Sequence, residues 1–170
     1  MDFEKLSAER YSLRKFSSRD VEPEKLAVIL EAARNAPTAH NDQPQRVFVL
    51  KSPEALAKAD ACMGSHFAPP VILAVAYDPA AAWKREQDGK NHGEIDAAIA
   101  ATQMMLQAAD LGLGTTYIGM FDPEKLLEAF PEMAGLVPIA LLDLGYPAEG
   151  AHPSRLHTSR MALEDMVKEL

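Results

Sequence analysis

The sequence predicts an α+β fold in which helices flank a mixed β-sheet, and two observations support this prediction. Helix-like and strand-like segments follow one another along the 170 residues with short breaks, and no linker, repeat or low-complexity stretch separates them. Their order is irregular, unlike the strict strand–helix alternation of a doubly wound Rossmann domain. We therefore assign residues 1–170 to a single domain.

The first half of the chain is predicted to hold three helices and two strands. A short helix is expected over residues 2–10, and a clearer one opens at Pro23, where apolar residues recur at helical spacing, and ends before Pro37. Residues 46–50 are β-branched and apolar, which predicts a strand. Ser52 is expected to cap a helix that begins at Pro53. The unbroken apolar run 71–77 predicts a strand buried on both faces.

The second half begins with the longest predicted helix, residues 94–111. Its small and apolar residues cover more than one face, which is typical of a central helix or of a subunit interface. Gly112 and Gly114 end this helix and lead into a strand over 115–118. Asp122 and Pro123 start a helix that runs to about residue 130, and a buried strand follows at 137–144. Residues 147–159 lack periodicity, and 161–170 predict a closing helix.

Composition narrows the class of protein. A net charge of -8 and an acidic pI near 5.1 argue against nucleic-acid and anionic-membrane partners, which bind basic surfaces. The most apolar stretch, 68–77, is too short to cross a bilayer, and the first residues lack the pattern of a signal peptide. The lone Cys62 cannot form an internal disulfide. These features predict a reduced, cytoplasmic protein.

Several common site motifs are missing from the sequence. No Gly-rich fingerprint follows a strand, so neither a Walker loop nor a dinucleotide-binding turn is indicated. The sequence also lacks a Gly-x-Ser-x-Gly elbow and a His-Glu-x-x-His zinc helix. None of the five histidines forms a close i, i+4 pair, and we expect no metal site.

Three polar clusters remain as candidate binding residues. Arg10, Ser12 and Arg14 offer forked donors and a hydroxyl suited to a phosphate, although a basic stretch at a helix end is an ordinary solvated feature. The run 157–160 (His-Thr-Ser-Arg) offers a second phosphate grip, or else Ser159 simply caps the last helix. The loop 36–44 carries two prolines and several hydrogen-bonding side chains, as a heterocycle-binding loop or a plain surface loop would.

Together these clusters resemble a known family. Arg-x-Ser-x-Arg at 10–14 is followed by Ala-Pro-Thr-Ala-x-Asn-x-Gln-Pro at 36–44 and by Leu-Gly-Leu-Gly-Thr-x-x-Ile-Gly at 111–119. Gly-Tyr-Pro at 145–147 then precedes His157 and Arg160. This order of motifs resembles the nitroreductase-like family of FMN-dependent oxidoreductases, and the match spans nearly the whole chain.

The resemblance implies a nitroreductase-like fold and a homodimer that holds two FMN molecules between its subunits, with the long helix at the dimer interface. It implies a phosphate site made from Arg10, Ser12 and Arg14 with His157 and Arg160, and Tyr11 is counted among the cofactor-binding residues. Along the isoalloxazine ring it implies Pro37, Thr38, Ala39 and Asn41 on one side and the backbone of Ile118, Gly119 and Met120 on the other, near N5. By the same resemblance, Gln43 is expected to support these residues without contacting the flavin itself.

The resemblance also implies a ping-pong reaction, in which NAD(P)H passes hydride to flavin N5 and a small acceptor, such as a nitroaromatic or a quinone, then takes it up. The cofactor carries the reactive atoms, so no side chain is expected to be catalytic. Tyr11 and Gln45 depart from the family pattern, in which an Arg and an aromatic residue are common at these places. The alternatives are a flavin-binding module without NAD(P)H turnover and a superfamily relative that uses flavin differently. Two roles are open for Cys62, a redox-active thiol and a small buried packing residue, and the packing role is favoured.

Overall fold

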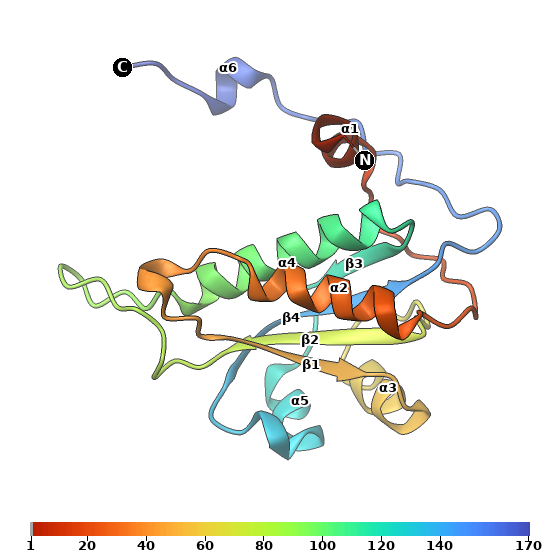
Figure 1. Ribbon diagram of the computed structural model, residues 1–170, viewed down its shortest axis with the longest axis horizontal. Coiled ribbons are helices and arrows are strands. Elements are labelled where there is room, and N and C mark those ends of the chain that lie inside the picture. The colour runs from red at the N-terminus through yellow and green to blue at the C-terminus, as the bar shows by residue number, and fades with distance from the viewer. Residues whose placement is uncertain (1) are drawn as a thin grey trace.

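The computed structural model describes residues 2–170 and has a four-stranded sheet with helices packed on both faces (Figure 1). The strands are β1 (Gln45–Leu50), β2 (Val71–Tyr77), β3 (Gly114–Ile118) and β4 (Val137–Gly145), in the spatial order β1-β2-β4-β3. Helices α2 (Pro23–Arg34) and α4 (Gly93–Asp110) cover one face, and α3 (Pro53–Asp60) and α5 (Pro123–Ala129) lie on the other (Figure 1). The predicted α+β class is confirmed.

Every pair of neighbouring strands in the sheet is antiparallel, which differs from the mixed sheet predicted. β2 and β3 run in the same direction, as expected for strands joined through the long helix α4. The last strand, β4, lies between them and runs the other way, so the parallel pair never forms. The parallel pairing found among residues 2–170 is an isolated bridge between Ser12 and Thr115.

The sheet separates two apolar cores. On one face Leu73 and Val75 of β2 pack with α2 and α4, and on the other Ile72 and Ala74 pack with α3 and α5. Successive side chains of a strand point to opposite faces, so a strand covered on both faces must be apolar throughout. The prediction for β2, made from its unbroken apolar run, is therefore confirmed.

Apart from the closing helix, the predicted helix ends agree with the structure to within about two residues. The Ser52 hydroxyl accepts the Ala55 N–H at 3.1 Å, which caps α3, and Asp122 accepts two N–H groups in the first turn of α5. α4 is stopped by Gly112, two residues after its last residue: the φ of Gly112, 77°, is the left-handed conformation that glycine favours, and the Leu113 N–H returns to the Ala108 carbonyl at 2.9 Å. Short 3-10 turns occur at Ala39–Asn41 and Pro131–Met133.

The two ends of the chain differ in how well the sequence predicted them. The N-terminal helix is confirmed as α1 (Phe3–Glu9), but the closing helix over 161–170 is wrong, because only α6 (Leu163–Met166) forms. Ser159 does not cap α6, whose N-cap residue is Ala162. The tail is exposed and extends away from the sheet (Figure 1), and so short a segment is marginal as a helix when it has nothing to pack against.

Two negative findings concern residues 2–170. Within that range no helix is both long enough and apolar enough to cross a membrane. The same residues contain no group of three or more His, Cys, Asp or Glu side chains arranged to hold a metal ion.

Candidate functional site

The segment 10–17, which we call the N-terminal arm, lies extended beside β3. The Leu13 N–H donates to the Thr115 carbonyl at 2.9 Å, and the Ser17 N–H donates to the Tyr146 carbonyl at 2.9 Å. Side chains of extended chain alternate between two sides, so Leu13 enters the core while Arg10, Ser12 and Arg14 face the other way. Backbone hydrogen bonds to the sheet therefore hold these polar side chains as a row.

Gly114 makes room for the arm. A Cβ atom added at Gly114 would lie 2.5 Å from Cδ2 of Leu13, so any larger residue would push the arm off β3. The Thr116 hydroxyl also donates to the Leu13 carbonyl, so β3 holds the arm at Leu13 by a second hydrogen bond. The sequence pattern identified Gly114 as a helix stop only, and this close approach was missed because it depends on a tertiary contact.

The structure brings the first and third polar clusters together in one cavity of about 270 Å³. The residues that line it are Arg10, Tyr11, Ser12, Arg14, Ser154, Leu156, His157 and Arg160. Tyr11 and His157 meet edge to face, with ring centroids 6.2 Å apart. The predicted phosphate residues thus share a cavity, and Ser154 and Leu156 are lining residues that the sequence analysis missed, because the aperiodic tail gives no signal of which side chains turn inward.

The cavity has an uncompensated positive charge. Partial burial, together with the nearby charge of Arg160, lowers the pKa of Arg10 below its ordinary value. The salt bridges found among residues 2–170 leave Arg10, Arg14 and Arg160 without a carboxylate partner. Like charges gathered around one cavity destabilise each other, and an anion bound between them removes that repulsion. The arrangement is suited to a phosphate group.

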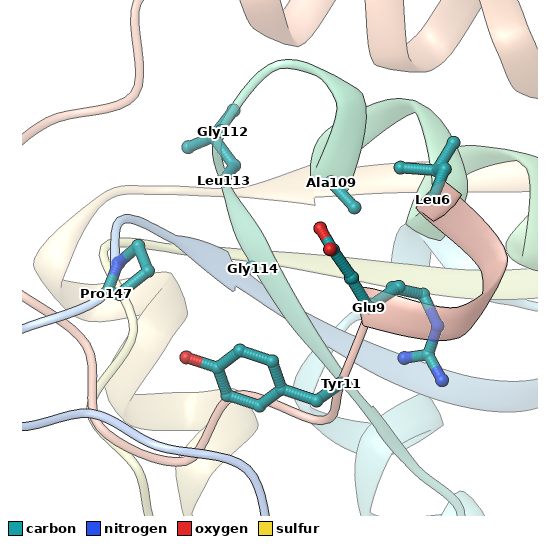
Figure 2. A pocket seen from close by; sticks show the side chains of 9 residues that line it. Leu6, Glu9, Tyr11, Ala109, Gly112, Leu113, Gly114 and Pro147 are labelled. Atoms are coloured by element: carbon teal, nitrogen blue, oxygen red, sulfur yellow. The ribbon is translucent and has the colours of Figure 1, made fainter. Parts of the chain in front are cut away.

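A second, mostly apolar cavity of about 200 Å³ adjoins the first and shares Arg10 and Tyr11 with it. Figure 2 shows the Tyr11 ring beside β3 at Gly114, while the Glu9 carboxylate points toward Ala109 near the end of α4. The phosphate-type cavity and this apolar space therefore both lie beside the C-terminal end of α4.

The loop 36–44 has a restrained and unusual backbone. His40, Asn41 and Gln43 all have positive φ, at 59°, 61° and 51°, in a conformation that non-glycine residues adopt rarely. Inside the loop the Thr38 hydroxyl accepts the Gln43 N–H at 3.1 Å. Ala36 and Pro44 anchor the loop ends in the protein, and the tip is exposed. The loop therefore exposes Asn41 and neighbouring backbone groups at the surface of the chain.

The end of β3 presents the third predicted group. Ile118 is buried in the α3/α5 core, so only its backbone can face a ligand, as the resemblance implies, whereas Met120 is 71% exposed. The Met120 carbonyl accepts the Gly64 N–H at 3.0 Å, which ties this turn to the segment after α3. Gly119 has no atom within 4 Å of an added Cβ and leaves open space above the turn.

These groups do not all meet within a single chain. The loop 36–44 is bonded to the first turn of α4 through Asp96, while the cavities at the arm lie beside Ala109 at its other end. At 1.5 Å of rise per residue, these points are roughly 20 Å apart along the helix. The phosphate-type residues are thus assembled, and the predicted ring-binding loop is not part of the same cavity.

Cys62 fits the reading as a small buried residue. Its side chain packs in the α3/α5 core and its thiol donates to the Lys58 carbonyl at 3.2 Å. Burial, and then the charge of Asp122, raise the pKa of the thiol above its ordinary value. A buried thiol that resists ionisation is a poor nucleophile, so the structure favours a packing role.

Comparisons with known proteins agree with this geometry. Residues 8–68 and 63–146 match the model of the Nitroreductase family. An Archaeoglobus fulgidus protein, provisionally described as an NADH dehydrogenase/NAD(P)H nitroreductase, is 28% identical over 167 residues, covering 89% of this chain and 94% of its own. A nitroreductase family protein from Clostridium difficile superposes with a TM-score of 0.92 at 36% identity, covering 99% and 98% of the two chains.

A third relative was solved in complex with FMN. This Desulfovibrio desulfuricans protein is 26% identical and superposes with a TM-score of 0.82 over 100% of this chain and 97% of its own. The family match covers more than half of the residues, and the fold and the order of motifs are those expected of it. The chain belongs to the nitroreductase family.

Proposed function

We propose that this protein transfers hydride from NAD(P)H through bound FMN to a small electron acceptor, by a ping-pong mechanism. Family membership makes it an NAD(P)H-dependent flavin oxidoreductase, with FMN as its cofactor. The acceptor class, which we take to be a nitroaromatic, a quinone or a similar small molecule, and the order of steps are the proposed part. The observation that carries the proposal is the arginine-lined cavity beside β3.

The residues of this cavity fit the phosphate of FMN. Guanidinium groups donate pairs of parallel hydrogen bonds to phosphate oxygens, and the Ser12 hydroxyl adds a further donor. Burial, and then the nearby charge of Arg160, lower the pKa of Arg10, and a dianionic phosphate bound beside the guanidinium would favour its charged form. We assign Arg10, Tyr11, Ser12, Arg14, His157 and Arg160 to the phosphate end of the cofactor.

The remaining predicted residues are assigned to the flavin ring. Bound FMN supplies the hydride-accepting N5 atom, and the protein binds and orients. Pro37, Thr38, Ala39 and Asn41 present a rigid loop to one side of the ring. Backbone groups at Ile118, Gly119 and Met120 lie opposite, where the open space above Gly119 lets a planar ligand approach the chain. No side chain is assigned an acid–base role.

We propose further that the site is shared between two copies of the chain. A twofold axis across α4 would set the first turn of one α4 beside the last turn of the other. The loop 36–44 of one protomer would then lie near the arm of its partner, and both halves of the site would face one FMN molecule. The separation of these groups along α4 within one chain supports this arrangement.

Exposed apolar side chains also support a dimer. The C-terminal tail leaves six large apolar residues exposed, namely Leu156, Met161, Leu163, Met166, Val167 and Leu170. Phe3 of α1 is 65% exposed near a shallow cavity of about 450 Å³ on the outer side of α4. Exposed apolar groups on the C-terminal tail and on the outer side of α4 are typical of a surface that a second subunit covers.

The test is the visible absorption spectrum of purified protein reconstituted with FMN, recorded before and after anaerobic NADH or NADPH. We expect flavin bands that bleach on addition of one of these reductants and return when a quinone is admitted. Bands that persist would contradict hydride transfer and favour a flavin-binding module. Protein that retains no FMN would contradict the cofactor assignment itself.

A further inference from the structure

Asp96 is a buried carboxylate for which the sequence analysis had no role. Of the residues that α4 buries, which are otherwise Gly93, four alanines and Met104, it is the only charged one. Its side chain is 2% exposed, and Oδ1 accepts the backbone N–H of Ala39 at 2.9 Å. Oδ2 is also buried and has no hydrogen-bond partner among residues 2–170.

Such a group costs stability, so its position needs a reason. A buried polar atom without a partner destabilises the folded state, and the first turn of a helix offsets only part of this cost through its dipole. Asp96 is not needed to cap α4, because the helix N-terminus is bonded by Asn91, whose side chain accepts the Gly93 N–H at 2.8 Å. What Asp96 does hold is the loop.

The loop needs an external anchor. Three of its residues have positive φ, a conformation that persists where the surroundings over-determine it and that gathers at functional sites. The hydrogen bonds within the loop join Asn41 and Gln43 to Thr38, and the Asp42 N–H to the Ala39 carbonyl, so they fold the loop onto itself. The bond from Ala39 to Asp96 ties this folded loop to the long helix.

We infer that Asp96 is a positioning residue for the flavin ring, acting through the Ala39 N–H to set the depth and angle of the loop 36–44. The inference rests on the proposed function, since it assumes that this loop lines the ring. It implies that losing the acceptor oxygen Oδ1 weakens binding of the flavin ring and leaves binding of the phosphate unchanged. Asp96 bonds to the loop, and it is not among the residues that line the cavity at the arm.

The experiment compares the affinities for FMN and riboflavin, which differ by the phosphate alone. For Asp96→Ala we expect both dissociation constants to rise by about tenfold, so that their ratio stays at the wild-type value, and the visible circular dichroism of the bound flavin to change. Asp96→Asn keeps an oxygen that accepts from Ala39, and we expect both constants within about threefold of wild type. Arg14→Ala should raise the dissociation constant for FMN and leave that for riboflavin unchanged, so that the preference for FMN over riboflavin is lost.

Two further variants separate positioning from general damage. Asp143→Asn alters another buried carboxylate, on the α3/α5 side of the sheet, and should leave both affinities unchanged. Ala39→Pro deletes the donor instead of the acceptor, at a first-turn position that tolerates proline. If the two groups act as one bond, adding Asp96→Ala to Ala39→Pro should cause no further loss.

The outcomes are distinct. An Asp96→Ala protein that binds both flavins like wild type, with unchanged circular dichroism, overturns the inference and leaves the proposed function intact. Selective loss of FMN over riboflavin, or an Asp96→Asn protein as impaired as Asp96→Ala, overturns it as well. A wild-type protein that binds neither flavin overturns the proposed function and the inference together.

Discussion

Arg14 is exposed in the single protomer, yet it lines the same cavity as the partly buried Arg10. We predict that Arg14→Ala weakens FMN binding by about 1.5–3 kcal/mol, the usual range for a hydrogen bond to a charged group. Arg34→Ala is the matched control, because Arg34 pairs with Glu31 on the outer surface of α2. Titration of apoprotein with FMN measures both variants, and full affinity in Arg14→Ala would remove this residue from the phosphate site.

Asp143 predicts a pH dependence of stability. Burial in the α3/α5 core, and then the charge of Asp60, raise the pKa of its carboxyl to about 7. Asp60 in turn pairs with His66 at 2.9 Å. Because the folded-state pKa lies above the unfolded value of 3.8, the unfolded chain releases a proton that the folded chain keeps. The contribution of this carboxyl group to stability is therefore complete below about pH 4 and is lost progressively toward pH 7, by roughly 4 kcal/mol.

We predict that Asp143→Asn removes most of this loss, because the amide cannot ionise. Urea unfolding at pH 5 and pH 8 measures it: the wild type should be less stable at pH 8, and Asp143→Asn should show a much smaller difference. Exposed Asp20 provides the control as Asp20→Asn, which should follow the wild type. If Asp143→Asn follows the wild type too, the carboxyl of Asp143 is not the group that titrates.

At the scale of elements, the N-terminal arm depends on a network around Tyr146. The Tyr146 hydroxyl donates to Glu22 at 2.6 Å and accepts from Lys25 at 2.7 Å, and the Arg19 guanidinium lies 3.9 Å from its ring centroid. The bond from Tyr146 is the largest cause that lowers the pKa of Glu22, to about 2. This network fastens the start of α2, and with it the arm, to the end of β4.

We predict that Tyr146→Phe lowers the free energy of unfolding by about 1–3 kcal/mol, since it leaves Lys25 and Glu22 each without one partner. A looser arm should also weaken FMN binding. Tyr77→Phe is the control, because Tyr77 packs on Gly93 and, among residues 2–170, its hydroxyl has no hydrogen bond to the arm. Urea unfolding and FMN titration of both variants decide it, and a Tyr146→Phe protein equal to Tyr77→Phe in both assays would contradict the role of the network.

Elements with a local signal were predicted well from the sequence. Ser52 and Asp122 cap helices as expected, and the unbroken apolar run of β2 correctly predicted that both of its faces are buried. The failures have tertiary causes: β4 separates β2 from β3, and the tail lacks a surface on which a helix could pack. Asp96 was missed for a similar reason, because its role depends on a loop far away in the sequence.

At the scale of the whole molecule, the exposed tail predicts a dimer that the tail stabilises. We expect the full chain to sediment as a dimer and a chain ending at Arg160 to dissociate at higher concentration, because it loses the apolar residues of the last segment. As a control, replacing the charged Glu164 and Lys168 by Gln should leave the dimer intact, because it removes no apolar surface. A full chain that is monomeric while saturated with FMN would contradict the shared site.

The most direct test of the shared site is a mixed dimer of Arg14→Ala and Asn41→Ala chains, separated by different affinity tags. A site built from two protomers combines the defects in one of its two sites and leaves the other with an intact arm and an intact loop. The account predicts that each homodimer binds FMN weakly and that the mixed dimer binds about one FMN per dimer with wild-type affinity. A mixed dimer in which every site is weakened would show that each flavin is held by a single chain, and would contradict the account.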